Sequence, residues 1–322
     1  MKRLTGILLL AALLSCAGLA PAELPETEIV PLPELPELTE GRITEIPVDQ
    51  NSLKESIAPR EENYLPEDET GLSAGYVDPS IAVSIGTGRV YETNYIYARV
   101  RIADPSQLRT LMASPINSLH TTPGHDLAKR VQAVIAINGD YAGGDSVTRG
   151  ALMRQGEKIR FKCNGSFDIL MIDKAGDLRI FRWAEDEDLE PVWDEAVQIF
   201  TFGPALILDG EAIRDGQRIN LGKNKAAQRM AICQTGPLEY LLITSEGPED
   251  PGSSGLTIDQ FVDLLDSIPE IRTAYNLDGG SSATMVFRKN GDSWKKVNAP
   301  QNRKIRPLKD IIYFATAWES GE

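Results

Sequence analysis

The sequence predicts an α+β fold in which mixed, mostly antiparallel sheets pack around one or two helices in a single domain. Short runs rich in β-branched and aromatic residues dominate the chain after residue 70, and helix-like segments are few. Strands and helices do not alternate regularly, which argues against a doubly wound parallel sheet. Hydrophobic residues make up 42% of the 322 residues, so the chain can bury a core and wholesale disorder is excluded.

Residues 1–22 have the order of a secretory signal: Lys2 and Arg3, an apolar run over residues 7–14, and then small residues. The run is far shorter than the roughly 20 residues that span a bilayer. Ala20-Pro21-Ala22 fits an ordinary cleavage site, whereas Leu13-Leu14-Ser15-Cys16 resembles a bacterial lipobox with Cys16 as the lipidated residue. We therefore expect an exported protein, either held at the extracellular face of the cell membrane by a lipid anchor or secreted.

Residues 23–70 are predicted to form a tether rich in proline and glutamate. They carry 14 acidic and 3 basic side chains, a net charge of −11 within a whole-chain charge of −14. Repeated Pro-Glu-Leu units favour extended polyproline II and repel one another. A short propeptide, or a strand-forming arm between Arg42 and Val48, is the alternative. The prolines are Pro25, Pro31, Pro33, Pro36, Pro47, Pro59 and Pro66.

Residues 71–322 form the predicted working domain. Subtracting +2 for residues 1–22 and −11 for residues 23–70 from −14 leaves −5 for this part. No basic excess occurs beyond the first three residues, which excludes a protein that binds a nucleic-acid backbone.

Cys163 and Cys233 are the cysteines of this domain. In an exported protein they could form a disulfide, but both lie in apolar, strand-like runs, so buried free thiols are equally consistent. The sequence has no C-x-x-C pair and only His120 and His125, which argues against a zinc site.

The predicted elements follow one another at short intervals. A turn at Lys174-Ala175-Gly176-Asp177 joins two strands into a hairpin. Asp104 or Ser106 can begin a helix through Leu111, and residues 126–132 predict another. Strands are predicted at residues 81–85, 95–102, 131–137, 167–172, 178–183, 197–202, 229–233, 240–244, 272–277, 285–287 and 311–315.

The clearest helix follows Thr257. Thr257 and Gln260 form a capping box, the apolar residues from Ile258 to Ile268 form one face, and Pro269 ends the helix.

One stretch stands out for chemistry, Tyr275-Asn276-Leu277-Asp278-Gly279-Gly280-Ser281-Ser282. A strand delivers Asp278 into a turn whose glycines allow close backbone approach and whose serines add donors. A carboxylate beside such a turn suits cleavage of a bond next to a phosphate. The alternative is an ordinary Asp-Gly hairpin turn.

A second stretch ends the predicted strand 131–137 with Asn138-Gly139-Asp140-Tyr141-Ala142-Gly143-Gly144-Asp145. Polar groups at the end of an apolar strand are well placed for a site, although a glycine-rich loop explains them as well. Arg229 enters a buried strand, so we expect an anionic partner from the substrate or the protein.

Taken together, these motifs resemble the phosphodiester glycosidase family over about residues 80–317. The family includes the mannose 6-phosphate uncovering enzyme and bacterial exopolysaccharide-biosynthesis-type relatives. The resemblance rests on an ordered set of motifs: Ala136-Ile137-Asn138-Gly139-Asp140-Tyr141, Phe202-Gly203-Pro204-Ala205-Leu206, Gln228-Arg229-Met230-Ala231-Ile232, Ser254-Gly255-Leu256-Thr257, Asn276-Leu277-Asp278-Gly279-Gly280 and Ile305-Arg306-Pro307-Leu308-Lys309-Asp310.

The resemblance implies a hydrolase that cleaves the glycosidic bond of a sugar-1-phosphodiester in envelope or extracellular polysaccharide. Asp278 is the leading nucleophile or general base, and Glu246 and Asp140 are the candidates for the second carboxylate. Arg229 would bind the phosphate, with Arg306 as a weaker candidate that could instead pair with Asp310. The remaining candidates for substrate binding are Asn138, Gly139, Asn276, Gly279, Gly280, Ser281, Ser282 and Ser254.

This scheme requires no metal or other cofactor, although Asp140, Asp145 and Asp278 could hold a hard cation if they converge.

Three positions depart from the family pattern. Ser281 replaces a third glycine, Glu246-Gly247-Pro248 replaces Asp-Gly-Arg, and Glu239 replaces a histidine. The two charged replacements leave open an alternative function. The protein could be a non-catalytic surface module that binds glycopolymers containing phosphate.

Overall fold

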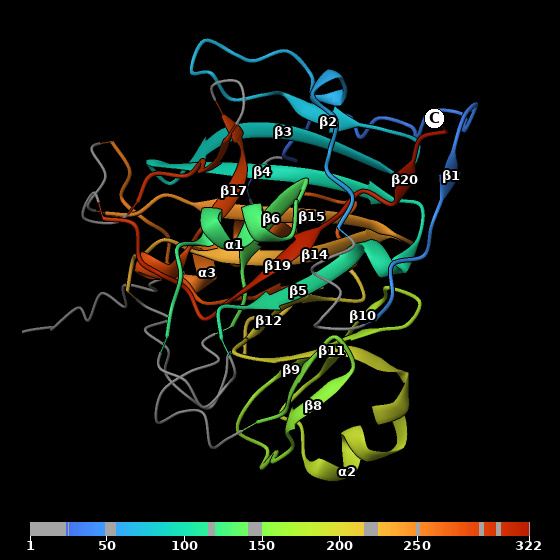
Figure 1. Cartoon of the computed structure of the whole chain (residues 1–322). Coiled ribbons are helices and arrows are strands. Elements are labelled where there is room, and N and C mark those ends of the chain that lie inside the picture. The colour runs from blue at the N-terminus through green and yellow to red at the C-terminus, as the bar shows by residue number, and fades with distance from the viewer. Residues whose placement is uncertain are drawn as a thin grey trace, which may run out of the picture.

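The computed structural model describes residues 24, 26–48, 56–114, 120–140, 150–215, 225–248, 252–289, 293–300 and 304–321 (Figure 1). The predicted signal segment 1–22, including Cys16, lies outside the described residues, as does Asp145. The described strands build sheets in which every pairing is antiparallel. The predicted antiparallel character of the fold is therefore confirmed.

Two large sheets make up the centre of the molecule. The first has the strand order β13 (Glu211–Ala212), β12 (Ala205–Leu208), β16 (Thr273–Asn276), β14 (Met230–Gly236), β15 (Glu239–Ser245), β4 (Thr93–Ile102), β3 (Ile81–Val90) and β2 (Gly75–Val77). The second has the order β18 (Ser293–Lys296), β17 (Met285–Lys289), β6 (Ile135–Asn138), β19 (Asp310–Phe314) and β5 (Leu108–Met112).

Alternation along the strands explains how the two sheets pack. In β4, Ile96 and Ala98 lie in the core shared by both sheets, whereas Tyr95 and Tyr97 lie in a second cluster on the other face. In β19, Ile312 joins the shared core and the flanking residues face away from it. Both faces of each sheet are thus apolar, but their side chains differ in size. A slip of β4 by one residue would put Tyr95 and Tyr97 into the shared core in place of Ile96 and Ala98, which fixes the strand register.

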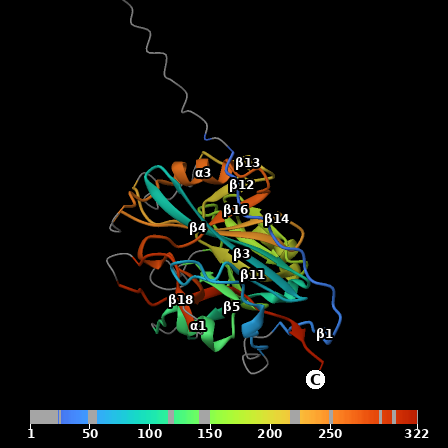
Figure 2. The same cartoon turned by 90° about the horizontal axis from the view of Figure 1, so that it is seen from above.

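The helices cover the outer faces of the sheets rather than the space between them. Helix α3 (Ile258–Asp266) packs on the first sheet, and α1 (Gly124–Arg130) packs on the second. Figure 2 shows α3 and α1 on opposite sides of the strands. The expectation that sheets wrap around one or two helices is therefore corrected: the sheets pack on each other, because each carries two apolar faces.

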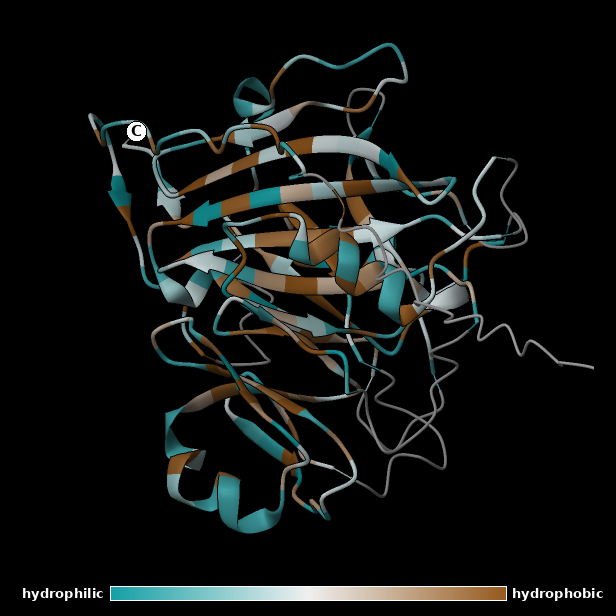
Figure 3. Cartoon of the chain, turned by 180° about the vertical axis from the view of Figure 1, so that it is seen from behind, coloured by the Kyte–Doolittle hydropathy of each residue, from teal (hydrophilic) through white to brown (hydrophobic). Residues whose placement is uncertain are grey.

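A third sheet, also of five strands, lies apart from the two central sheets and is here called the small sheet. Its order is β10 (Leu178–Phe181), β9 (Ile169–Asp173), β11 (Ala196–Thr201), β7 (Leu152–Arg154) and β8 (Glu157–Arg160). It has its own apolar cluster, closed by the short helix α2 (Asp186–Leu189) and the 3-10 helix η5 (Glu190–Glu195). Figure 3 shows that α2 is largely hydrophilic on its outside. The predicted hairpin at Lys174 is confirmed between β9 and β10.

Local signals predicted the helix ends unevenly. The capping box of α3 is confirmed: the Gln260 amide donates to Thr257 Oγ1 over 3.2 Å, and the Thr257 amide donates to Gln260 Oε1 over 3.0 Å. The helix expected from Asp104 is wrong. Asp104 caps only the 3-10 helix η3 (Pro105–Gln107), and the following residues form β5, because their apolar side chains pair with β19.

Cys163 and Cys233 are both buried free thiols that lie in different clusters. Of the two alternatives for this pair, the free thiols hold.

Residues 26–48, here called the N-terminal arm, lie against the domain over much of their length. The Thr27 amide donates to the carbonyl of Ser267, and the Val30 amide donates to the Tyr97 hydroxyl. Further along, Arg101 bonds the Pro33 carbonyl and pairs with Glu34 at 2.6 Å. The extended backbone that the prolines favour thus has its carbonyls bound by arginines of β4.

The strand-forming alternative for residues 42–48 is present as β1 (Arg42–Ile43), which pairs with β20 (Trp318–Glu319). The chain continues through the 3-10 helix η2 (Glu61–Asn63) to a bridge between Tyr64 and Tyr76. Among the described residues, no helix is long and apolar enough to cross a membrane.

These contacts predict that the arm resists proteolysis in the folded protein. A glutamate-specific protease should cleave within residues 26–45 only slowly, because the bound backbone must first detach. Arg101→Ala removes the Pro33 and Glu34 contacts and should speed this cleavage several-fold, whereas Arg89→Ala, an exposed arginine of the same sheet, should not. Mass spectrometry of the digest measures the cleavage rate. Cleavage of the wild-type arm as fast as that of an unfolded peptide would contradict the docked arm.

Candidate functional site

The two stretches that the sequence singled out meet in space. Asn138 ends β6 and Asp278 follows β16, which lies in the other large sheet. The Asn138 side chain donates to the Asp278 carbonyl over 2.7 Å and accepts from the Thr284 amide over 2.9 Å. The Asp278 amide faces the Gly139 carbonyl at 3.4 Å. Asn138 thus clamps the two loops together, and its amide group is used within the protein.

Asp278 is a half-buried carboxylate at the entrance to the glycine–serine turn. Burial raises its pKa above the ordinary value. The hydrogen bond from Ser282, the charge of Arg306 and the Gly279 amide lower the pKa, and the Asp140 carboxylate raises it. Asp278 therefore combines poor solvation with nearby donors, which is the environment of a reactive carboxylate.

The turn after Asp278 is packed tightly against β14. It forms the 3-10 helix η6 (Gly280–Ser282), with Gly280 at a φ of +57°. A Cβ on Gly279 would approach the Gln228 carbonyl oxygen to 2.6 Å, and the Gly280 amide donates to that oxygen over 2.8 Å. The Gly280 amide is therefore satisfied by the protein. It is not offered to a phosphate, contrary to the expectation from the sequence.

Arg306 lies beside the same turn. Its exposed side chain donates from Nη1 to Ser281 Oγ over 2.9 Å. The pairing with Asp310 considered from the sequence is wrong, because Asp310 is buried and bonded to a different arginine. Arg306 thus supplies a solvent-accessible positive charge next to Asp278 and Ser281.

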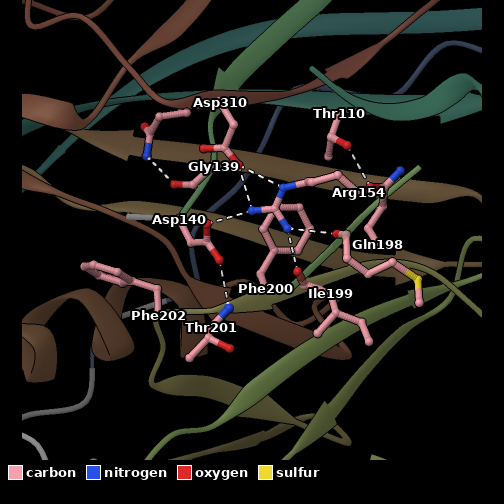
Figure 4. A network of polar contacts seen from close by, with 12 residues as sticks. Thr110, Gly139, Asp140, Arg154, Gln198, Ile199, Phe200, Thr201, Phe202 and Asp310 are labelled. Atoms are coloured by element: carbon pink, nitrogen blue, oxygen red, sulfur yellow. Dashed lines mark hydrogen bonds and ion pairs between the residues drawn. The ribbon is translucent and has the colours of Figure 1, made fainter. Parts of the chain in front are cut away.

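That other arginine is Arg154 of β7, which the sequence analysis missed. Its side chain is fully buried and lies over the Phe200 ring at 4.0 Å (Figure 4). Nε and Nη2 donate to Asp310 Oδ2 over 2.9 and 2.7 Å, and Nη2 also donates to Asp140 Oδ1 over 2.6 Å. The signal was the one used for Arg229, an arginine within an apolar run, but here the run is only three residues long.

Asp140 is held on both oxygens. Oδ1 accepts from Arg154, and Oδ2 accepts from the Thr201 amide over 2.8 Å. Its side chain is 1% exposed. The structure thus places Asp140 behind the loop as a buried ion-pair partner.

Gly139 lies directly against Asp310. A Cβ on Gly139 would come within 2.5 Å of both Asp310 carboxylate oxygens. The pKa of Asp310 is raised to about 7, mainly by burial. The charges of Asp140 and Asp278 add to this rise, and the charge of Arg154 opposes it.

Arg229 is buried directly before β14, and its Cα lies 3.8 Å from the place that a Cβ on Gly279 would occupy. Nε donates to the Leu256 carbonyl over 2.9 Å, and Nη2 donates to the Lys225 carbonyl over 2.6 Å. Burial lowers the pKa of its guanidinium to about 10. These bonds join the chain before β14 to the chain before α3, so Arg229 organises backbone near Gln228.

Glu246 is bonded within the protein through both carboxylate oxygens. Oε1 accepts from the Ala299 amide over 3.1 Å, and Oε2 accepts from Asn94 over 3.3 Å. Its charge acts on Lys296 of β18, whose pKa burial lowers to about 8. Lys296 in turn donates to the Ala283 carbonyl. Lys296, also missed from the sequence, thus bonds the end of the turn and feels the charge of Glu246.

The remaining candidates divide between core and surface. Asn276 donates to the Gly203 carbonyl over 2.7 Å, and its buried Oδ1 has no hydrogen-bond partner among the described residues. Ser254 is exposed, and its amide donates to the Glu92 carbonyl. The cation site considered from the sequence includes Asp145, outside the described residues. In the part of the chain that the structure describes, no three metal-ligating side chains come together.

A cavity of about 610 Å³ lies elsewhere, between the N-terminal arm and the small sheet. Arg109, Lys158 and Trp193 line it, and none of the predicted site residues does. Arg109 is already bonded to the carbonyls of Ser106 and Pro47. We therefore place the candidate site at the Asp278 turn.

The contact between Gly139 and Asp310 predicts that Gly139→Ala disturbs the site. The new methyl group would overlap the Asp310 carboxylate, so the free energy of unfolding should fall by about 1–3 kcal/mol. Gly236→Ala is the matched control, because its Cβ would meet nothing closer than 3.4 Å, the movable end of Glu239. Urea unfolding measures both variants, and equal stabilities would contradict this packing.

Comparison with known proteins places the fold. The catalytic domain of zebrafish N-acetylglucosamine-1-phosphodiester alpha-N-acetylglucosaminidase, auto-inhibited by its pro-peptide, superimposes with a TM-score of 0.57. The two sequences are 18% identical, and the match covers 78% of this chain and 86% of that one. A hypothetical protein from Synechocystis matches with a TM-score of 0.49 and 15% identity, over 73% of this chain and 62% of that one.

No curated protein matches the chain. The model of the phosphodiester glycosidase family matches residues 131–315, which is more than half of the chain and contains Asn138, Arg154, Asp278 and Asp310. The chain therefore belongs to the phosphodiester glycosidase family.

Proposed function

We propose that this protein is an exported hydrolase that cleaves the glycosidic C–O bond of a sugar-1-phosphodiester in envelope or extracellular polysaccharide. The observation that carries the proposal is that Asp278 and Arg306 lie beside one turn, where the charge of Arg306 acts on Asp278. A poorly solvated carboxylate and an exposed guanidinium, joined through Ser281 and Ser282, suit a substrate with a reacting sugar carbon next to an anionic phosphate. Membership of the family supports the reaction class.

The chemistry of the leaving group explains why so few residues are needed. A phosphate monoester is a weak base, so its departure needs charge stabilisation more than a strong general acid. Arg306 and Ser281 would bind this phosphate at the surface of the turn. Asp278 would serve the anomeric carbon as a nucleophile, or as a general base for water.

The other charged candidates take supporting roles in this scheme. Asp140 is bound on both oxygens, so it acts on the site through its charge rather than as the second reacting carboxylate. Arg229 holds backbone, which leaves Arg306 as the preferred phosphate ligand. Glu246 remains the candidate for a second carboxylate, since its charge acts on Lys296, which bonds the end of the turn.

Export and anchoring belong to the proposal as well. The secretory pattern of residues 1–22 supports export, and Cys16 would carry the lipid. Because the N-terminal arm is docked from Thr27 onward, only the ten residues 17–26 would separate the lipid from the domain. Fully extended, they span at most about 35 Å. The domain would thus be held close to the membrane surface.

A non-catalytic module that binds phosphate-containing glycopolymers is the second candidate. The charged residues that depart from the family pattern, Glu239 and the stretch from Glu246 to Pro248, favour it. Both candidates predict binding, but only the hydrolase predicts turnover of an activated sugar-1-phosphodiester.

Asp278→Asn should lower kcat by about 10³-fold or more, because the amide can neither attack the sugar carbon nor accept a proton. The fold should survive, since Asn is isosteric and can still accept from Ser282. The control is Asp259→Asn on the exposed side of α3, which should keep full activity. Release of free sugar measures turnover, and a wild-type rate in Asp278→Asn would remove Asp278 from the mechanism.

Arg306→Ala should raise KM about tenfold, the loss expected for one charge-assisted hydrogen bond to the phosphate. Its stability should match that of the wild type, since the side chain is exposed. Arg272→Ala, another exposed arginine, is the control. An unchanged KM and kcat in Arg306→Ala would show that the phosphate is bound elsewhere.

A further inference from the structure

In the buried ion-pair network behind the turn, Asp140 acts on the site through its charge, whereas its two partners have no role in the reaction scheme so far. The network consists of Arg154, Asp140 and Asp310, which come from the small sheet, from the loop after β6, and from the first residue of β19 (Figure 4). All three side chains are about 1% exposed. Burying two carboxylates with one guanidinium costs free energy unless good geometry and further hydrogen bonds compensate. A functional role would explain why the protein contains this network.

We propose that Arg154 and Asp310 are positioning residues of the candidate site. They hold Gly139 against the Asp278 backbone, and their combined charge with Asp140 determines how strongly the site repels an anionic phosphate. This inference rests on the proposed function. It concerns residues that never touch the substrate.

The positioning follows from a continuous chain of contacts. Arg154 is fixed at its own end, because Nη1 donates to the carbonyls of Met153 and Ile199 over 3.0 and 2.5 Å. Its other donors hold Asp310 and Asp140. Asp310 packs against the Cα of Gly139, whose carbonyl faces the Asp278 amide. A shift of Arg154 is therefore passed to the Asp278 backbone through one loop.

The charge of the network depends on pH. When both carboxylates are ionised, Arg154 leaves one net negative charge buried. Burial raises the pKa of Asp310 to about 7, the charge of Arg154 opposes this rise, and the charges of Asp140 and Asp278 add to it. The charge of Arg160, on β8, also acts on Asp140 and Arg154. Below about pH 7, Asp310 is protonated and the Arg154–Asp140 pair is neutral.

Two consequences can be measured. As the pH rises through about 7, ionisation of Asp310 adds a negative charge behind the phosphate site, so an anionic substrate should bind more weakly. The pKa of Asp310 is 3.8 in the unfolded chain and about 7 in the folded protein, so protonation of Asp310 stabilises the folded state. This contribution to stability is present at low pH and is lost as the pH rises through about 7.

The experiment compares Arg154→Lys and Asp310→Asn with Arg179→Lys and Asp259→Asn. Arg154→Lys keeps the charge but cannot bond both carboxylates in the same way. Arg179 forms an exposed ion pair with Glu195 in the same small sheet, so Arg179→Lys controls for the substitution itself. Asp310→Asn keeps the shape and an acceptor oxygen while removing the charge, and it decides the question if Arg154→Lys does not fold.

Activity is measured on a sugar-1-phosphodiester, whose single charge is constant between pH 5 and 9. In Arg154→Lys, kcat should fall by about 10²-fold with little change in KM, and amide exchange in residues 276–285 should quicken at least tenfold. In Asp310→Asn, the rise of KM through pH 7 should disappear, and so should the matching loss of thermal stability. Both controls should behave like the wild type.

Binding of the same phosphodiester to Asp278→Asn, with and without Asp310→Asn, is measured by calorimetry. This separates the inference from the proposed function, since absent turnover would overturn the proposed hydrolysis alone. A pH dependence of binding and stability that is unchanged by Asp310→Asn would overturn the charge-setting role. Wild-type amide exchange and kcat in Arg154→Lys would overturn the positioning role.

Discussion

The Arg154 guanidinium, shared by Asp140 and Asp310, is the interaction on which the candidate site depends. It is the point where the small sheet, the loop after β6 and the start of β19 are joined by charge rather than by apolar packing. Removing Arg154 would leave two carboxylates in the core without a compensating charge, and breaking a buried pair in this way typically costs about 3–5 kcal/mol. Gly139 is therefore packed against Asp310 on one side, and its carbonyl accepts from the Asp278 amide on the other.

The packing of the sheets makes this meeting possible. Asn138 and Asp278 lie at the ends of strands in different sheets, and the two sheets share one apolar core. Alternation fixes the register of the central strands within each sheet. Packing of the two sheets on the shared core then brings the ends of β6 and β16 close enough for the Asn138 side chain to bond the Asp278 carbonyl over 2.7 Å. Helices α1 and α3 contribute by covering the outer faces, not by carrying reacting groups.

Local patterns in the sequence predicted most of the central strands, the α3 capping box and the two loops of the site, but they missed β7 and gave β5 as a helix. They could not predict the ion pair between Arg154 and Asp310, because the two residues are 156 positions apart and no local sequence pattern indicates which residue each one contacts. Arg306 and Arg229 show the same limit. The family resemblance implied that Arg229 binds the phosphate, and a pairing of Arg306 with Asp310 was left open. In the structure, Arg306 lies at the exposed turn and Arg229 bonds backbone carbonyls.

The position of the broken bond tests the central claim most directly. Hydrolysis of a sugar-1-phosphodiester in water enriched in oxygen-18, followed by mass spectrometry of the products, shows which atom water attacks. If Asp278 serves the sugar carbon and Arg306 binds the leaving phosphate, the phosphate monoester will contain no oxygen-18. Oxygen-18 in the phosphate monoester would mean attack at phosphorus and would contradict the assignment of Asp278 and Arg306.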